Sequence, residues 1–224
     1  MKNLFLLILF IPALYPAYSQ APASEDYENS LRNGLMGFEY RNSAERYKGN
    51  QYFKDWAKGD VYLENGEVIS NIFLRYDQYM DEVLWLRETD FKTGVLPRGD
   101  IIGFVIYNER KEPLAEFLRR RIKLPYKSDS SETFLQVLVK GNLELFAYRK
   151  VMQSANNYTL LDDTRYLIFS NGNSYYTGAS KRQLFKVPCI DEVKMKALLK
   201  SNKFRLDGTE YSLMRLIDLY NKSK

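Results

Sequence analysis

The nine residues VYLENGEVI, positions 61–69, place Asn65-Gly66 between two short runs in which apolar and polar side chains alternate. Asn-Gly flanked by such runs is a strong signal for a β-hairpin, because both residues accept the positive φ angles of a two-residue turn. Pairing Glu64 with Glu67 across this turn produces one strand face that is almost wholly apolar and suited to a core. That face comprises Val61, Leu63, Val68, Ser70, Ile72, Leu74 and Tyr76.

Two more turn signals and several further apolar runs extend this pattern along the chain. The turns are Gly141-Asn142 and Asn171-Gly172, and the runs cover residues 82–87, 101–107, 115–124, 134–140, 143–149, 166–170 and 174–177. Short connections are typical of antiparallel neighbours, and a large open antiparallel sheet tends to curl into a barrel or split into a sandwich. We therefore predict a mainly β single domain with a curled antiparallel sheet, barrel-like or a sandwich.

The C-terminal segment, residues 180–222, has helical periodicity instead. In 191–202 the residues Val193, Ala197 and Leu198 fall on one stripe, and Ser180–Lys186 suggests a shorter helical turn. In 207–220 Thr209 is placed as an N-cap, ahead of a stripe of Leu213, Leu216, Ile217 and Tyr220. We expect short C-terminal helices that cover one face or one open end of the sheet.

The first 19 residues have the pattern of a secretory signal peptide. Lys2 is followed by the apolar run LFLLILFI (4–11) and by Ala17-Tyr18-Ser19, with small residues at both key positions of a cleavage site. The run is too short for a membrane anchor. We expect residues 20–224 to form a soluble, periplasmic or secreted protein that is not an integral membrane protein after cleavage.

Two features of the composition limit the chemistry. The chain contains no His and only one Cys. Catalysis by Ser-His-Asp or Cys-His groups, histidine metal sites and intrachain disulfides are therefore excluded. Cys189 has the apolar neighbours Val187 and Ile190, which predicts a buried free thiol. We expect no cofactor, and we do not expect an enzyme.

The acidic stretch LRYDQYMDE, residues 74–82, allows two interpretations. It lacks the ligand spacing and central Gly of an EF-hand loop. We interpret it as a structural turn in which Asp77 caps the bend while Asp81 and Glu82 remain solvated. The second interpretation is a binding rim that comprises Arg75, Tyr76, Asp77, Tyr79 and Asp81.

A basic run follows in the predicted strand 115–124. Arg119, Arg121 and Lys123 share one face of that strand with Phe117, and such a cluster is a candidate anion contact. The alternative is a solvated or edge strand whose charges prevent aggregation. Nucleic-acid binding is not expected, because the protein is predicted to be exported and its net charge of +5 is modest.

Several short motifs resemble those of a family of uncharacterised exported β-rich bacterial proteins. They include Gly49-Asn50-Gln51-Tyr52-Phe53, Leu74-Arg75-Tyr76-Asp77 and Tyr175-Tyr176. The resemblance implies a signal peptide, a β-rich body and a short helical tail. It implies no activity, cofactor or catalytic residue.

These observations favour a non-catalytic binding or cell-envelope accessory protein, with a cell-envelope protein or a glycan as partner. One alternative is a carboxylate-dependent glycan-processing enzyme that uses an acidic pair: Glu64/Glu67, Asp81/Glu82 or Asp162/Asp163. Another is a carrier whose curled sheet encloses a small apolar ligand. A pocket with two facing carboxylates would favour the enzyme, and a closed apolar cavity would favour the carrier.

Overall fold

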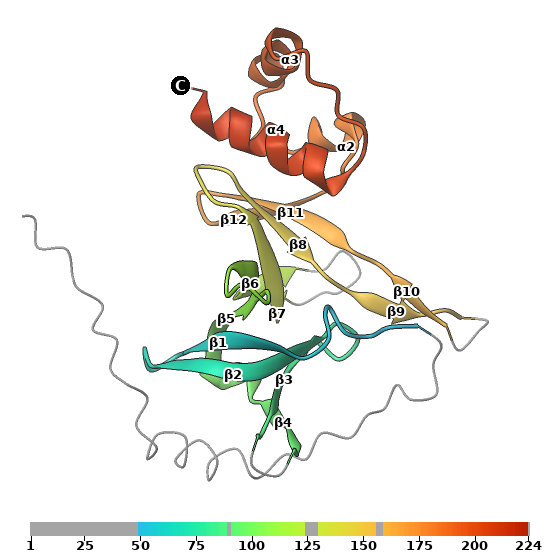
Figure 1. The fold of residues 1–224 in the computed structure, drawn as a ribbon. Helices are drawn as coiled ribbons and strands as arrows, with labels where there is room; N and C mark the ends of the chain where they lie inside the picture. Colours follow the sequence, from blue (N-terminus) through green and yellow to red (C-terminus); the bar gives the residue numbers. More distant parts are fainter. Residues whose placement is uncertain (1–48, 89–90, 124–129, 156–158, 224) are drawn as a thin grey trace, which may run out of the picture.

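One antiparallel sheet of ten strands dominates the computed structural model, which describes residues 49–88, 91–123, 130–155 and 159–223 (Figure 1). The strand order is β12-β11-β8-β7-β6-β5-β1-β2-β3-β4, and the sheet curls without closing. The predicted mainly β fold with short C-terminal helices is confirmed. The predicted signal peptide lies outside the described residues.

Most strands of the sheet coincide with the runs found in the sequence. Their bounds are β1 (Ala57–Leu63), β2 (Val68–Asp77), β3 (Glu82–Leu86), β4 (Thr93–Leu96), β5 (Ile101–Tyr107), β6 (Pro113–Lys123), β7 (Ser130–Val139), β8 (Glu144–Tyr148), β11 (Arg165–Ser170) and β12 (Asn173–Thr177). The short strand β4 was not predicted. Neither was the separate two-stranded ribbon of β9 (Val151–Gln153) and β10 (Leu160–Asp162).

The first hairpin has a different register from the predicted one. Tyr62 pairs with Val68, and the Leu63 N–H donates to the Glu67 carbonyl at 2.9 Å. Gly66 has a positive φ of 86°, whereas Asn65 does not, so the connection is a three-residue loop and not a two-residue turn. The slip of one residue turns Val68 outward, where it is 47% exposed, and Ile69 inward, where it is 5% exposed.

A β-bulge in β2 restores the predicted phase further along. Gly59 pairs with Ile72 while Val61 pairs with Ile69, so Asp60 faces two residues, Ser70 and Asn71. Asn71 has a φ of +60°, in the left-handed region. Beyond this bulge Leu74 and Tyr76 are fully buried as predicted. The predicted core face is therefore right from Ile72 onward and wrong for Val68 and Ser70.

The other two turn signals have different outcomes. Asn171 and Gly172 both have positive φ, and Ser170 pairs with Asn173, so this hairpin has the predicted two-residue turn. At Gly141-Asn142 the loop is longer, because Val139 pairs with Leu145.

The curled half of the sheet, from β1 to β7, surrounds an aromatic core. The rings of Phe104 and Phe117 stack with centroids 4.7 Å apart, and Tyr76 and Phe134 pack against them at 4.9 to 5.6 Å. All four side chains are at most 1% exposed. Aromatic contacts of this kind stabilise a core beyond their buried area.

The other half of the sheet carries the helices α2 (Lys181–Leu184), α3 (Glu192–Ser201) and α4 (Glu210–Lys222), which lie above β8, β11 and β12 in Figure 1. Helix α4 has the predicted N-cap, Thr209, and buries Leu213, Leu216 and Ile217 as predicted. Arg149, just after β8, forms an ion pair of 2.7 Å with Glu210 and so joins the sheet to this helix.

Helix α3 buries a different stripe from the predicted one. Val193 is 79% exposed and Ala197 is also exposed, whereas Met195 is fully buried and Leu199 is partly buried. The N-cap Asp191 accepts hydrogen bonds from two backbone N–H groups, as expected for the start of a helix. Because α3 packs against α4, the side that meets α4 decides which residues are buried.

Within the described part of the chain, none of the helices has both the length and the apolar character needed to cross a membrane.

Candidate functional site

The stretch 74–82 forms the end of β2, a tight turn and the start of β3. The Asp77 Oδ1 accepts hydrogen bonds from the backbone N–H groups of Tyr79 and Met80, both at 2.9 Å. Its Oδ2 accepts from the Gln51 side chain at 2.7 Å. The predicted capping role of Asp77 is therefore confirmed, although the residue is fully buried.

Asp81 is not solvated, which corrects the prediction for this residue. It is 6% exposed, has a φ of +59°, and accepts hydrogen bonds from the Tyr76 and Thr133 hydroxyls at 2.7 Å each. Arg98 lies 3.3 Å away. Burial raises the pKa of Asp81 above its usual value, and the charge of Arg98 and the hydrogen bonds offset part of this shift. The turn is thus an internal polar junction.

The five residues of the predicted binding rim consequently do not form a shared exposed surface. Tyr76, Asp77 and Asp81 are buried. The Arg75 guanidinium lies between the rings of Tyr52 and Trp56, at 4.4 and 4.7 Å, and pairs with Asp55. The Tyr79 carbonyl accepts a hydrogen bond from Lys150 at 2.5 Å.

The three basic residues of the predicted anion contact differ in exposure and in partners, and Arg119 and Arg121 both lie within 4.0 Å of the Glu132 carboxylate. Strand β6 lies between β5 and β7, so it is not an edge strand. Arg119 donates to the carbonyls of Arg98 and Gly99 at 2.7 and 2.8 Å and pairs with Glu64. Its guanidinium is therefore used within the fold, whereas Arg121 and Lys123 are exposed.

The acidic pairs considered for catalysis stabilise turns and ion pairs. Glu64 pairs with Arg119, and Asp163 pairs with Arg165 at 2.6 Å. Asp162 accepts hydrogen bonds from the Thr164 backbone and hydroxyl at 2.8 and 2.6 Å. These contacts give the carboxylates local structural partners.

The carrier alternative required a ligand inside the curl of the sheet. The rings of Tyr76, Phe104, Phe117 and Phe134 fill that position and pack against one another. A ligand at this place would have to displace four fully buried side chains, so the described core does not favour a carrier.

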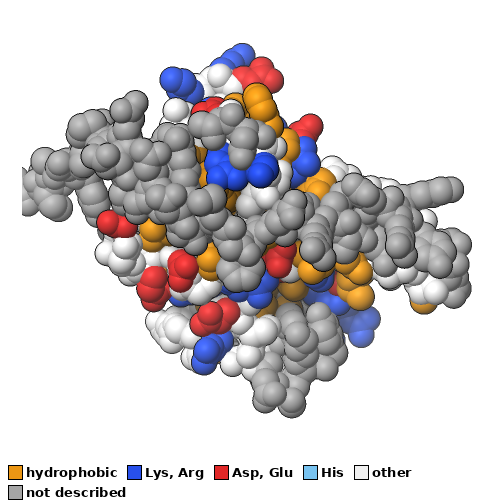
Figure 2. Space-filling view, turned by 90° about the horizontal axis from the view of Figure 1, so that it is seen from below, with side chains coloured by type: hydrophobic (Ala, Val, Ile, Leu, Met, Phe, Trp, Pro, Cys, Tyr) orange, Lys and Arg blue, Asp and Glu red, His pale blue; other side chains and the backbone are white. Residues whose placement is uncertain are grey.

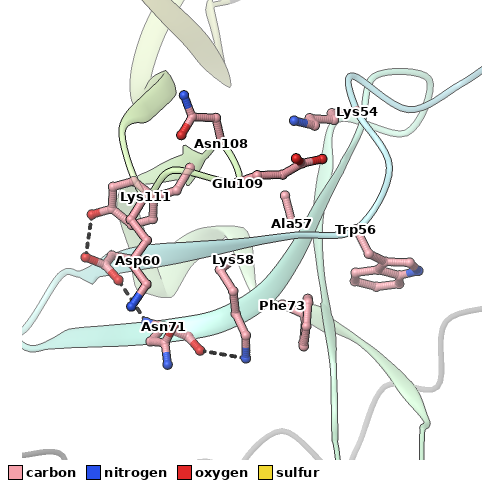
Figure 3. Close-up of a pocket in the computed structure, with 11 residues that line it drawn as sticks. Lys54, Trp56, Ala57, Lys58, Asp60, Asn71, Phe73, Asn108, Glu109 and Lys111 are labelled. Carbon is pink, nitrogen blue, oxygen red and sulfur yellow. Dashed lines mark hydrogen bonds between the residues drawn. The ribbon is translucent and has the colours of Figure 1, made fainter.

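A groove on the outer face of β1, β2 and β5 offers a more accessible site (Figure 3). Its volume is about 620 Å³. It is lined by Lys54, Trp56, Ala57, Lys58, Asp60, Asn71, Phe73, Tyr107, Asn108, Glu109 and Lys111. Three aromatic rings, two amides and charges of both signs therefore meet on one surface.

The bulge at Asn71 forms part of this groove, and a small hydrogen-bond network fixes it. The Asp60 carboxylate accepts from the Asn71 N–H at 2.8 Å and from the Tyr107 hydroxyl at 2.7 Å. The Lys58 ammonium donates to the Asn71 carbonyl at 3.1 Å and lies 3.8 Å from the centre of the Phe73 ring. Burial and the contact with Asp60 raise the pKa of Tyr107, so its hydroxyl stays protonated.

Three charged side chains of the groove remain available to a ligand. Among the described residues, Lys54, Glu109 and Lys111 form no ion pair within 4.0 Å. Glu109 and Lys111 are exposed in the turn between β5 and β6. The groove can therefore supply donors and an acceptor at its edge while its floor stays fixed.

The charges on the lower face of the molecule are mixed. Among the described residues visible there, acidic and basic side chains both occur, with hydrophobic side chains between them (Figure 2). The described residues visible on this face show no single-signed basic stripe of the kind typical of nucleic-acid-binding proteins. The described part of the chain also contains no group of three or more acidic or Cys side chains placed to hold a metal ion.

Compared with known proteins, the chain matches no family model, no curated protein and no solved structure. The resemblance to exported β-rich bacterial proteins therefore stays a prediction.

Proposed function

We propose that this chain is an exported, non-catalytic binding protein whose outer groove holds a short stretch of a cell-envelope glycan. The observation that carries the proposal is the bulge at Asn71. A positive φ is uncommon for a residue other than glycine, even though Asn tolerates it better than most, and such conformations are concentrated at functional sites. Bulges likewise occur next to sites where they re-aim side chains. Here the bulge lies in the groove itself, held by Asp60 and Lys58.

The chemistry of the lining suits a sugar. Trp56 and Phe73 each carry a cation over the ring, Arg75 at 4.7 Å and Lys58 at 3.8 Å, and their remaining apolar surface can receive the C–H face of a pyranose. Asn108, Glu109 and Lys111 provide hydrogen-bond donors and acceptors for its hydroxyl groups. A concave site with apolar walls and a few fixed polar groups is typical of small-ligand recognition.

The partners and positions of the two carboxylates in the groove support a role in binding rather than in hydrolysis. Asp60 already accepts hydrogen bonds from two internal donors, and its role is to hold the bulge. Glu109 lies in an exposed turn. A glycosidase needs two carboxyl groups placed across the scissile bond, and Asp60 is occupied by the fold.

Tryptophan fluorescence can test the proposal directly. The chain has two tryptophans, and Trp56 alone lines the groove. In the Trp85→Phe variant, titration with chitotetraose, cellotetraose or an oligogalacturonate should change the emission of Trp56. Calorimetry should give a matching dissociation constant. The Phe73→Ala substitution should weaken binding about tenfold or more, since it removes a stacking surface.

Tyr211→Ala provides the matched control, because Tyr211 is an aromatic residue that is 71% exposed on α4 and outside the groove. This variant should bind like the parent. The proposal would be overturned if none of these glycans bound to the groove. It would also be overturned if the Phe73→Ala and Tyr211→Ala proteins bound with equal affinity.

A further inference from the structure

A second concave site lies beside the middle of β6, on the helix-bearing half of the sheet. Its volume is about 530 Å³. It is lined by Arg120, Arg121, Gly141, Asn142, Glu144, Phe169, Ser170, Asn171 and Gly172. Two hairpin loops, after β7 and after β11, thus meet two consecutive arginines from β6.

Arg120 distinguishes this site from an ordinary charged surface. It is half-buried, and its guanidinium carbon lies 5.8 Å from the centre of the Phe146 ring. Its sequence neighbours pair with carboxylates, Arg119 with Glu64 and Arg121 with Glu132. Arg120 has no carboxylate within 4.0 Å among the described residues. A partly desolvated guanidinium without a counter-ion is costly, and an incoming anion would relieve that cost.

Three of the other lining side chains can donate hydrogen bonds to an anion. Asn142, Ser170 and Asn171 carry side-chain donors at the two loops. Glu144 is the one acidic side chain among the lining residues, and within the described chain it forms no ion pair with either arginine. The planar fork of Arg120 can bind two oxygens of one group at once.

We propose that this concavity is a binding site for a tetrahedral oxyanion, phosphate or sulfate, with Arg120 as its principal ligand. The anion can be a free ion or an ester on a saccharide, and the chemistry of recognition is the same for both. The site is separate from the outer groove, with which it shares no lining residue. Its existence therefore does not depend on the glycan proposal.

Titration of the full chain with sodium sulfate and sodium phosphate, against sodium chloride at equal ionic strength, tests the site. The backbone amide signals of Asn142 and Asn171 should shift with saturation in NMR spectra. A sulfated disaccharide should cause the same shifts, and its affinity relative to the free ion distinguishes an ester from inorganic ion as the preferred source.

The Arg120→Gln variant should weaken binding about tenfold or more, while Arg110→Gln, at an exposed turn, should leave it unchanged. Arg120→Lys keeps the charge but loses the fork, and it should bind with intermediate affinity. If the Arg120→Gln protein does not fold, the affinity of the Arg120→Lys protein tests the site instead. Shifts no larger than those with chloride, or an Arg120→Gln protein that binds within about twofold of the parent, would exclude the site.

Discussion

The Asp81 carboxylate accepts a hydrogen bond of 2.7 Å from the Thr133 hydroxyl, across 52 positions of the sequence. Asp81 belongs to the turn between β2 and β3, and Thr133 to β7, which is four places away from β2 in the sheet. The contact therefore joins two parts of the curled sheet that are not connected by backbone hydrogen bonds between β2 and β7. It links two strands of the open sheet that are not neighbours in it.

Thr133→Val should destabilise the fold by about 1 to 3 kcal/mol, because a buried carboxylate loses one of its donors while the side-chain shape is kept. Urea denaturation measures the change. Thr93→Val on β4 is the control, since no hydrogen bond of the Thr93 side chain occurs among the described contacts. If the two variants were equally stable, the contact would not hold the curl.

Asp81 also predicts a pH dependence of stability. Its folded-state pKa is raised, chiefly by burial, so the native protein binds the proton more tightly than the unfolded chain. From about pH 3.8 upward, stability relative to Asp81→Asn should fall until the pH exceeds the folded-state pKa. Denaturation of both proteins across this range checks the sign. A relative stability that rises with pH would contradict it.

The comparison with Asp81→Asn also separates its titration from that of neighbouring groups. Glu82 has a raised pKa as well, and Arg98 and Tyr76 face the Asp81 carboxylate. Glu82 and Arg98 are present in both proteins. The difference curve therefore reports mainly on Asp81.

Local signals in the sequence predicted most of the strands, the Thr209 cap and the stripe of α4, because periodicity and capping depend on residues close in the chain. The fate of Asp81 could not be predicted in this way, since Thr133 reaches it only after the sheet curls. The outer groove was missed for the same reason: Asp60, Asn71 and Tyr107 come from three strands. The one available signal was Asn71 within an apolar run, because Asn tolerates the left-handed conformation of a bulge.

The bulge itself can be tested by substitution at Asn71. Asn71→Ala should lower the free energy of unfolding by about 1 kcal/mol, because a φ of +60° is less favourable for alanine than for asparagine. Asn71→Gly should be close to neutral, since glycine adopts this φ readily. Thermal denaturation of both variants measures this order. If the glycine variant were less stable than the parent and the alanine variant equally stable, the backbone conformation of Asn71 would not determine the stability at this position.

Cys189 is half-buried rather than fully buried, and it packs at the edge of the helix-bearing core. Burial raises the pKa of the thiol above its usual 9.0, which leaves less thiolate at neutral pH. Alkylation of the folded protein at pH 8 should therefore be slower than alkylation in urea. Equal rates in both conditions, measured by mass spectrometry, would mean that the folded thiol is not protected.

The last prediction concerns the junction between α4 and the loop after β7. Asn221 donates to the Leu143 carbonyl at 2.8 Å and accepts from the Leu143 N–H at 2.9 Å. This pairing requires Gly141, because a Cβ there would lie 2.4 Å from the Asn221 Nδ2. Gly141→Ala should consequently destabilise the protein by about 1 to 3 kcal/mol through steric conflict.

A double-mutant cycle separates this conflict from the cost of backbone conformation at Gly141, which has a φ of +156°. Asn221→Ala alone should cost about 1 kcal/mol for each of the two partly buried hydrogen bonds that it removes. In that background Gly141→Ala should cost less than it does alone, because the clashing amide is gone while the backbone cost remains. Strictly additive effects would indicate that the two residues do not meet. A coupling energy would show that the junction of helix and sheet depends on this close approach.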